Sequence, residues 1–263
     1  MSEHIKSISF LGAGNVATHL ARAFYSTGYT IAGIYSPGMI SASVLAAEVS
    51  AWVCKTIQEL SEQAELIIVS VPDHAFAEVL ESLSSSTKFI VHTSGGLDLA
   101  AMRGKVARFG VLYPLQTFSK NTEVSLKKVP FCIEASDKKL QAELHLLASS
   151  VSDTVLDINS AQRRILHLAA VFACNFPNCL YAIAANLLKN ADLSFELLHP
   201  LILETAHKVT VHHPLESQTG PAYRGDIATM KEHEAMLSNS ESYRQIYDLL
   251  SKAIQEQLMK NEV

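Results

Sequence analysis

The chain has 263 residues, of which 48% are hydrophobic and 18% are charged, and this composition is typical of a folded globular protein. Its length suggests two domains, since a domain usually contains about 100 to 200 residues. The net charge of -5 provides no positive field for a polyphosphate backbone, so nucleic acid is not an expected partner.

The cysteines and the N-terminus indicate a reducing compartment. Cys54, Cys132, Cys174 and Cys179 form no CxxC pair and show no regular spacing, which excludes a typical zinc site or disulfide framework. We interpret all four as buried thiols. The first ten residues lack the apolar run of a secretory signal, so a cytoplasmic protein is expected.

Short β-branched or apolar runs recur in the first part of the chain, with stretches of helical periodicity between several of them. The predicted strands are residues 5–11, 30–35, 65–71, 89–92, 109–112 and 130–134. The clearest predicted helices between them are residues 16–26 and 43–49. Strands that alternate with helices predict an α/β fold, here a Rossmann-type doubly wound parallel sheet in residues 1–157.

From about residue 160 the pattern changes to long helical stretches with hardly any strand signal. The predicted helices are residues 161–190, 194–211, 227–237 and 241–260. A strand ends near Asp157, and either Asn159 or Ser160 could cap the helix that follows. We therefore expect an all-α C-terminal domain in residues 158–263.

Residues 165–188 carry no Asp, Glu, Lys or Arg and are long enough to span a bilayer. Three Asn, a His and a Pro in this stretch would be expensive in lipid, and the chain offers no second span. We expect a buried helix and no membrane association. A small helical domain has little interior in which to bury it, so the sequence predicts a homodimer formed through this domain.

A glycine-rich turn follows the first predicted strand and opens the first predicted helix. It matches the pattern GxGxxA, in which Gly12 permits a tight turn, Gly14 admits a pyrophosphate and Ala17 allows close packing. The alternative is a purely structural turn. The residues predicted to bind a dinucleotide here are Gly12, Ala13, Gly14, Asn15 and Val16.

The end of the second predicted strand bears on the choice of dinucleotide. Ser36 stands where an NAD-type site usually has a carboxylate that binds the ribose 2′-hydroxyl. Without that carboxylate NADP(H) is favoured, although NAD remains an alternative because no Lys or Arg appears before Lys55.

Polar segments end three later strands, and in an open α/β sheet the ligand lies outside the carboxyl ends of the strands. These segments predict further cofactor contacts at Val71, Pro72, Thr93 and Ser94, a catalytic role for Tyr113 and a substrate contact at Gln116. Ordinary strand-exit turns are the alternative interpretation.

The segments LGAGNVATHLA, VSVPDHAF, HTSGG, GVLYPLQTFS, HLAAVFACNF and TGPAYRGD, in this order, resemble the Rossmann-like DUF2520 family. Its members are described as NADP oxidoreductases, and the similarity covers nearly the whole chain. More distantly, the layout is similar to pyrroline-5-carboxylate reductase, the coenzyme F420-dependent NADP reductase and the 6-phosphogluconate dehydrogenase-like enzymes. In these, a helical domain completes the active site and often forms a dimer.

Two departures from this family affect what the resemblance implies. Many relatives have His where this chain has Tyr113, which leaves the proton donor of that loop open. Many have Arg where this chain has Pro37, which weakens the NADP assignment.

On the long apolar helix, His167 and Asn175 are separated by two steps of four residues and are predicted to share a face. The 6-phosphogluconate dehydrogenase-like enzymes commonly place Lys and Asn four residues apart on the corresponding helix. If Asn175 matches that Asn, Val171 replaces the Lys. His167 is then the predicted proton donor, with Asn175 orienting substrate or nicotinamide. Alternatively, both side chains satisfy neighbouring backbone groups.

The segment TGPAYRGD and the helix after it supply the remaining candidates. Predicted substrate contacts are Thr219, Arg224, Asp226 and His233, with Arg224 binding a carboxylate or phosphate. The alternative makes Asp226 a helix cap and Arg224 part of a surface ion pair. No metal site is expected.

The sequence therefore predicts an NAD(P)-dependent oxidoreductase, with NADP(H) favoured, that transfers hydride to or from a small polar substrate between the two domains. Two alternatives stay open: a dinucleotide-binding sensor without turnover, and a helical dimerisation module that carries a degenerate nucleotide fold.

Overall fold

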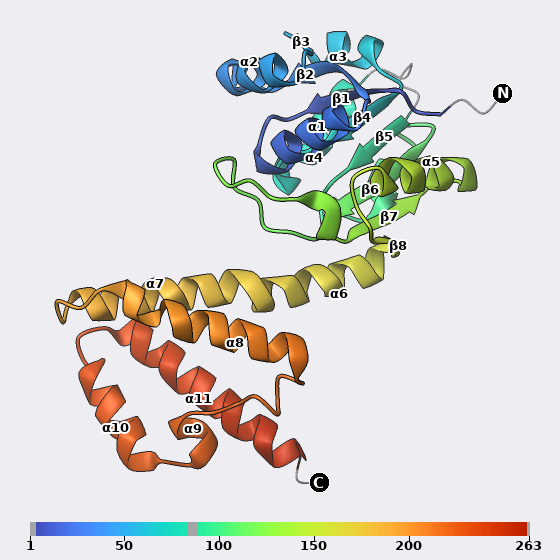
Figure 1. The fold of residues 1–263 in the computed structure, drawn as a ribbon. Coiled ribbons are helices and arrows are strands. Elements are labelled where there is room, and N and C mark those ends of the chain that lie inside the picture. The colour runs from blue at the N-terminus through green and yellow to red at the C-terminus, as the bar shows by residue number, and fades with distance from the viewer. Residues whose placement is uncertain (1–3, 84–88, 262–263) are drawn as a thin grey trace. The chain divides into compact units, whose positions relative to one another are not determined.

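The computed structural model describes residues 4–83 and 89–261. The chain divides into two compact units, Met1–Asn175 and Phe176–Val263, which we call the sheet unit and the helical unit (Figure 1). The predicted boundary after Asp157 marks the change from strands to helices, whereas the units divide later, because the first helix after the sheet packs onto the sheet unit.

The sheet has eight strands in the order β3-β2-β1-β4-β5-β6-β7-β8. Their bounds are β1 Ser7–Leu11, β2 Thr30–Tyr35, β3 Trp52–Val53, β4 Leu66–Val69, β5 Phe89–His92, β6 Phe109–Pro114, β7 Phe131–Ala135 and β8 Val155–Asp157. All neighbours pair in parallel except β6 and β7, which are antiparallel. The predicted α/β class is confirmed, and the strand order reverses between β1 and β4, where such sheets hold ligands.

Helices cover both faces of the sheet. They are α1 Asn15–Ser26, α2 Met39–Glu48, α3 Ile57–Gln63, α4 Phe76–Ser82 and α5 Lys138–Ser149. Apolar side chains of α1, α2 and α5 pack in one cluster that includes Phe10, while α3 and α4 pack in a second cluster that includes Met102. The sheet unit thus has the two-sided core that its alternating sequence pattern predicts.

Helix α6, Ser160–Ala170, begins where the sequence predicts a cap. The Asn159 side chain accepts from the backbone N–H of Gln162, and the Gln162 side chain accepts from the backbone N–H of Asn159. This reciprocal pair identifies Asn159 as the cap. After α6 the helix continues through a five-residue π segment, Val171–Asn175.

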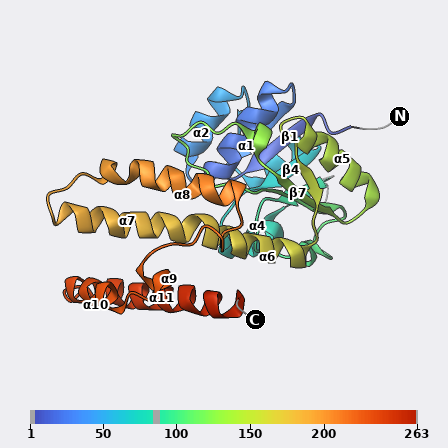
Figure 2. The ribbon, with the colours of Figure 1, turned by 60° about the horizontal axis from the view of Figure 1, so that its bottom comes forward.

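The helical unit consists of α7 Phe176–Lys189, α8 His199–Val211, α9 Pro221–Arg224, α10 Ile227–Met236 and α11 Glu241–Asn261. Helix α8 lies beside α7 in both views, and α9 lies against α11 (Figures 1 and 2). Among the described residues of this unit, only Ala222, Leu237 and Ser251 are buried. The unit therefore has almost no interior of its own.

The long apolar helix is not buried, so that prediction is wrong for a single chain. The helix Ser160–Lys189 is apolar and long enough to cross a membrane, although core helices of soluble proteins can have the same length and composition. None of its most apolar 18-residue segment is buried. Cys54 and Cys132 are buried as predicted, but Cys174 is only partly buried and Cys179 is exposed, since both lie on this uncovered stretch.

Candidate active site

The glycine-rich turn joins β1 to α1 in a conformation that requires glycine. Gly12 has a φ of +110°, and a Cβ there would lie 2.2 Å from the carbonyl oxygen of Ser70. At Gly14 a Cβ would meet nothing within 4 Å. The turn thus combines a strained backbone position with open space beside Gly14.

Helix α1 starts at this open space without a side-chain cap. Gly14 is its N-cap residue, and no side chain accepts from the first backbone N–H groups. Such N–H groups carry partial positive charge and favour anions. The start of α1 therefore fits a pyrophosphate.

A cavity of about 480 Å³, which we call the dinucleotide cavity, runs along the turn. Six predicted cofactor residues line it: Gly12, Ala13, Gly14, Ser36, Val71 and Pro72. The cavity extends from the glycine turn to Ser36 and Ser41 at the carboxyl end of β2. It therefore covers the expected positions of the pyrophosphate and of the adenosine ribose.

Three further predicted cofactor residues do not line this cavity. The Asn15 amide donates to the carbonyl oxygen of Phe118 at 2.8 Å, and Val16 packs against the core. The Thr93 hydroxyl lies 3.1 Å from that of Ser70, which does line the cavity. Asn15 and Thr93 thus hold neighbouring segments of the cavity wall.

The fourth residue outside the dinucleotide cavity, Ser94, shapes the turn after β5. Its hydroxyl accepts from the backbone N–H groups of Gly96 and Leu97, both at 3.0 Å. Gly95, between Ser94 and Gly96, lies directly under His167: a Cβ on Gly95 would be 2.7 Å from the imidazole ring. The glycine at this turn therefore makes room for His167.

A second cavity, of about 590 Å³, lies between the loop after β6 and one side of α6 and the π segment, and we call it the helix cavity. Its lining residues are Tyr113, Leu115, Gln116, Thr117, Phe118, Leu166, His167, Ala169, Ala170, Ala173, Cys174 and Asn175. All belong to the sheet unit. The structure thus brings together four residues predicted for catalysis or substrate binding: Tyr113, Gln116, His167 and Asn175.

Tyr113 and His167 form a hydrogen-bonded pair in the wall of the helix cavity. The Tyr113 hydroxyl lies 3.2 Å from Nδ1 of His167, and the two rings meet edge to face. Burial raises the pKa of Tyr113, so its hydroxyl stays protonated at neutral pH. An exposed imidazole beside a protonated phenol is an arrangement that can deliver a proton.

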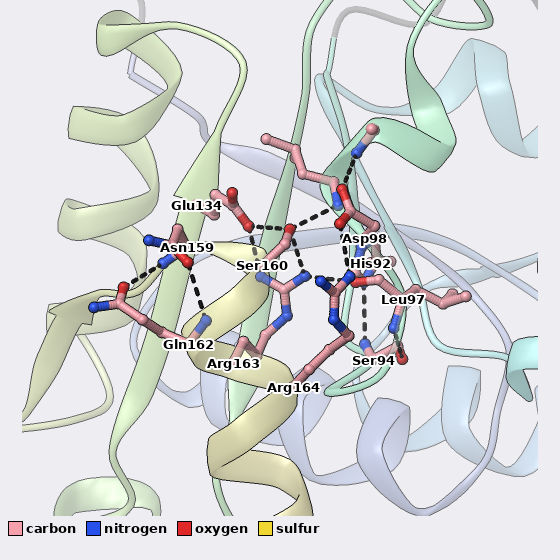
Figure 3. A network of polar contacts seen from close by, with 12 residues as sticks. His92, Ser94, Leu97, Asp98, Glu134, Asn159, Ser160, Gln162, Arg163 and Arg164 are labelled. Atoms are coloured by element: carbon pink, nitrogen blue, oxygen red, sulfur yellow. Dashed lines mark hydrogen bonds and ion pairs between the residues drawn. The ribbon is translucent and has the colours of Figure 1, made fainter.

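A buried network fixes α6, and with it His167, to the sheet (Figure 3). The fully buried Arg163 guanidinium donates to Glu134 Oε2 at 2.7 Å and to the carbonyl oxygen of Leu97. The Ser160 hydroxyl donates to the same carboxylate oxygen at 2.7 Å. Since Arg163 precedes His167 by one helical turn, this network sets the position of the imidazole.

Two neighbouring groups complete the network. Arg164 pairs with Asp98 at 2.7 Å on the surface. Buried His92 accepts from the backbone N–H of Ser94 through Nδ1 at 3.2 Å. Burial, and secondarily the charge of Arg163, lower the pKa of His92 to about 3, so this imidazole is neutral.

The other four predicted substrate residues belong to the helical unit. Thr219 lines a hollow of about 490 Å³ there, and Arg224 is exposed at the end of α9. Asp226 caps α10, as the alternative interpretation states, and Nδ1 of His233 lies 3.0 Å from the Tyr247 hydroxyl. Their proposed substrate contacts stay predictions.

Several residues of these sites were not found from the sequence. Lys120 lines the dinucleotide cavity although it follows β6, far along the chain from the glycine turn. Gly95 and the pair Arg163 and Glu134 support His167. The two glycines of HTSGG were the only sequence signal for these residues, whereas the partners of Arg163 and the place of Lys120 in the cavity depend on tertiary structure.

Comparisons with known proteins place these sites in context. Residues 7–96 match the family "NADP oxidoreductase coenzyme F420-dependent", and residues 129–254 match the "domain of unknown function (DUF2520)". A Bacteroides fragilis protein described as a putative NADP oxidoreductase is 44% identical; the match covers 95% of this chain and 98% of that one, with a TM-score of 0.90. No curated protein matches the sequence. The predicted resemblance, the oxidoreductase class and the NADP cofactor are confirmed.

More distant solved structures share the fold. The reductive aminase of Aspergillus terreus, solved with NADPH and ethyl-5-oxohexanoate, is 15% identical, with 95% of this chain and 94% of that chain covered and a TM-score of 0.71. The 1-pyrroline-5-carboxylate reductase of Streptococcus pyogenes is 14% identical, with 95% and 98% covered and a TM-score of 0.60.

Proposed function

Because the chain belongs to the DUF2520 family of Rossmann-type NADP oxidoreductases, we propose that it reduces a small polar carbonyl or imine compound held at the helix cavity. The observation that carries this proposal is the hydrogen-bonded pair of Tyr113 and His167 in the wall of that cavity. The family supplies the redox chemistry, and this pair supplies the proton that reduction of a C=O or C=N bond requires.

The residues of the dinucleotide cavity fit NADP(H). The open space at Gly14 and the uncapped start of α1 would receive the pyrophosphate, and Ser36 would lie near the 2′-phosphate. When bound, NADPH supplies the hydride. The chain's own residues hold the cofactor without placing a carboxylate from β2 beside the 2′ position.

In the proposed reaction His167 is the proton donor, with Tyr113 holding its Nδ1 so that Nε2 is free for the substrate. Asn175 lines the same cavity and is suited to orient the substrate or the nicotinamide amide by hydrogen bonds. Gln116, on the opposite wall, is a further polar contact for the substrate.

We also propose that a second copy of the chain covers the exposed apolar helices. Leu201 and Leu203 on α8 are 62% and 70% exposed. They are two residues apart and point to different sides of the helix, so more than one side of α8 carries exposed apolar surface. Apolar surface of this extent marks an interface. A membrane span suits it less, because the first turns of the apolar stretch hold Arg163 and Arg164 in ion pairs with the sheet unit.

The test measures NADPH consumption by its near-ultraviolet absorbance with a panel of ketones, aldehydes and preformed imines. With an active substrate, His167→Gln should lower turnover by about 10² to 10⁴-fold while leaving NADPH affinity nearly unchanged. His145→Gln, a matched change on α5, should have no effect. Turnover within a few-fold of wild type in His167→Gln would eliminate this role.

A different outcome would separate the two remaining functions. NADPH binding without consumption of any compound in the panel would favour a dinucleotide sensor over an enzyme. Failure to bind NADPH or NADH at all would refute both.

A further inference from the structure

The charges around the dinucleotide cavity are few compared with those of its ligand. Among the described residues that line it, Lys120 is the one cation and Glu78 the one carboxylate. A dinucleotide pyrophosphate carries two negative charges, and the start of a helix offers only about half a positive charge. A cationic side chain at this end of the cavity would add to the positive charge that the helix start offers to the pyrophosphate.

Lys120 belongs to the segment that connects β6 to the short helix at Leu126–Lys128, and α1 binds this segment just before Lys120. The Asn15 amide donates to the carbonyl of Phe118 at 2.8 Å, and Nε2 of His19 donates to the carbonyl of Ser119 at 2.9 Å. The buried His19 ring also contacts the Phe118 ring, at 4.9 Å between centroids. Two consecutive carbonyls are thus fixed to the helix that opens the phosphate site.

The ammonium of Lys120 is available for a ligand. Its side chain is exposed, and no hydrogen bond or ion pair joins it to another residue in the described part of the chain. Because Phe118 is held to Asn15, the first residue of α1, the backbone of Lys120 follows two residues after that anchor, which favours the α1 end of the cavity. This end is the glycine turn, where the pyrophosphate belongs, and not the end at Ser36.

We infer that Lys120 binds the pyrophosphate of the dinucleotide. This inference rests on the proposed function only in that a dinucleotide occupies the cavity. It also gives Asn15 a different role from direct cofactor contact, because Asn15 positions the segment that presents Lys120.

The experiment measures the affinities of NADPH and NADH by titration calorimetry with Lys120→Met, Lys120→Arg and, as a matched control, Lys128→Met. Loss of an exposed charge-assisted contact should weaken both cofactors by a similar factor, about tenfold. Binding to Lys120→Met should also depend less on ionic strength. Lys120→Arg should retain most of the affinity, and Lys128→Met should match wild type.

Each other result overturns the inference. If Lys120→Met weakens NADPH but not NADH, the ammonium binds the 2′-phosphate instead. If both affinities stay within twofold of wild type, Lys120 is only a solvated surface residue. Gly14→Asp is a separate check on the site, because a carboxylate there would repel the pyrophosphate. If this folded variant binds NADPH with wild-type affinity, the dinucleotide does not bind in this cavity, and the proposed cofactor site is refuted together with the role of Lys120.

Discussion

The two units of this chain differ in how far they bury their apolar side chains. In the sheet unit, Ile8, Phe10 and Phe24 have no exposed surface, and helices cover both faces of the sheet. In the helical unit, Leu203 and Leu249 are 70% and 69% exposed. The difference supports the proposed dimer, in which a second copy of the chain would cover the apolar side chains that the helical unit leaves exposed.

The largest expected effect concerns this association. Wild type should have twice the mass of the 28.7 kDa chain in light scattering. The double variant Leu201→Glu, Leu203→Glu should weaken self-association by about 100-fold or more, because each leucine contributes roughly 1.5 to 3 kcal/mol when buried. At micromolar concentration the variant should be monomeric.

The matched control changes two exposed leucines of the sheet unit, Leu146→Glu and Leu156→Glu, and should leave the mass unchanged. A wild type with the mass of one chain would contradict the proposed dimer and would leave the exposed helices without a partner.

Within the sheet unit, the buried ion pair gives the next effect. Arg163→Met leaves the partly buried Glu134 without its buried partner and should lower the free energy of unfolding by about 3 kcal/mol. The adjacent Arg164→Met removes only a surface pair and should cost less than about 1 kcal/mol. Denaturant unfolding measures both. Equal losses would show that the network does not fix α6 to the sheet.

The last effect is a pH dependence of the sheet unit, with the smallest change in stability per pH unit. The pKa of His92 falls to about 3 in the folded chain, from an ordinary value of 6.5, because of burial first and Arg163 second. The unfolded chain therefore takes up a proton that the folded chain does not. The contribution of His92 to the free energy of unfolding should be fully present above pH 6.5. It should decline by roughly 1.4 kcal/mol per pH unit between pH 6.5 and 3.

His92→Gln should reduce this slope by one proton when unfolding is measured between about pH 4.5 and 6.5. Asp137, whose pKa is lowered to about 2 by Arg108, loses its contribution only below its ordinary value of 3.8 and does not interfere in that window. An unchanged slope would show that His92 is not neutral at low pH.

Much of the sheet unit follows from local pattern. The strands Thr30–Tyr35 and Phe89–His92 have the predicted bounds, since each is a short run rich in β-branched or apolar residues. The strand at Trp52–Val53 was not predicted because two residues carry no periodicity. The antiparallel pairing of β6 and β7 depends on contacts between strands, which a single sequence does not display.

The site was partly predictable for a similar reason. Gly12 and Gly14 could be proposed because the glycine turn is a local pattern, Tyr113 because it ends a strand, and His167 because its helical spacing relates it to Asn175. The predicted burial of the apolar helix was wrong for a single chain. An apolar composition indicates that a helix face packs against something, but it does not show which part of the protein or which partner packs against it. Arg163 could not be found because its partners Glu134 and Leu97 are distant in sequence, and Lys120 because the cavity that it lines is formed by distant segments.

The π segment has a consequence for the geometry of the proposed reaction. A regular α-helix completes two turns in about 7.2 residues, so side chains eight residues apart would diverge by roughly 80°. His167 and Asn175 are eight apart and both line the helix cavity, and the π segment Val171–Asn175 winds more residues into a turn, which reduces this divergence. The relative direction of these two side chains therefore depends on the number of residues in this turn. Deleting or inserting one residue there would rotate one side chain away from the other without changing either side chain.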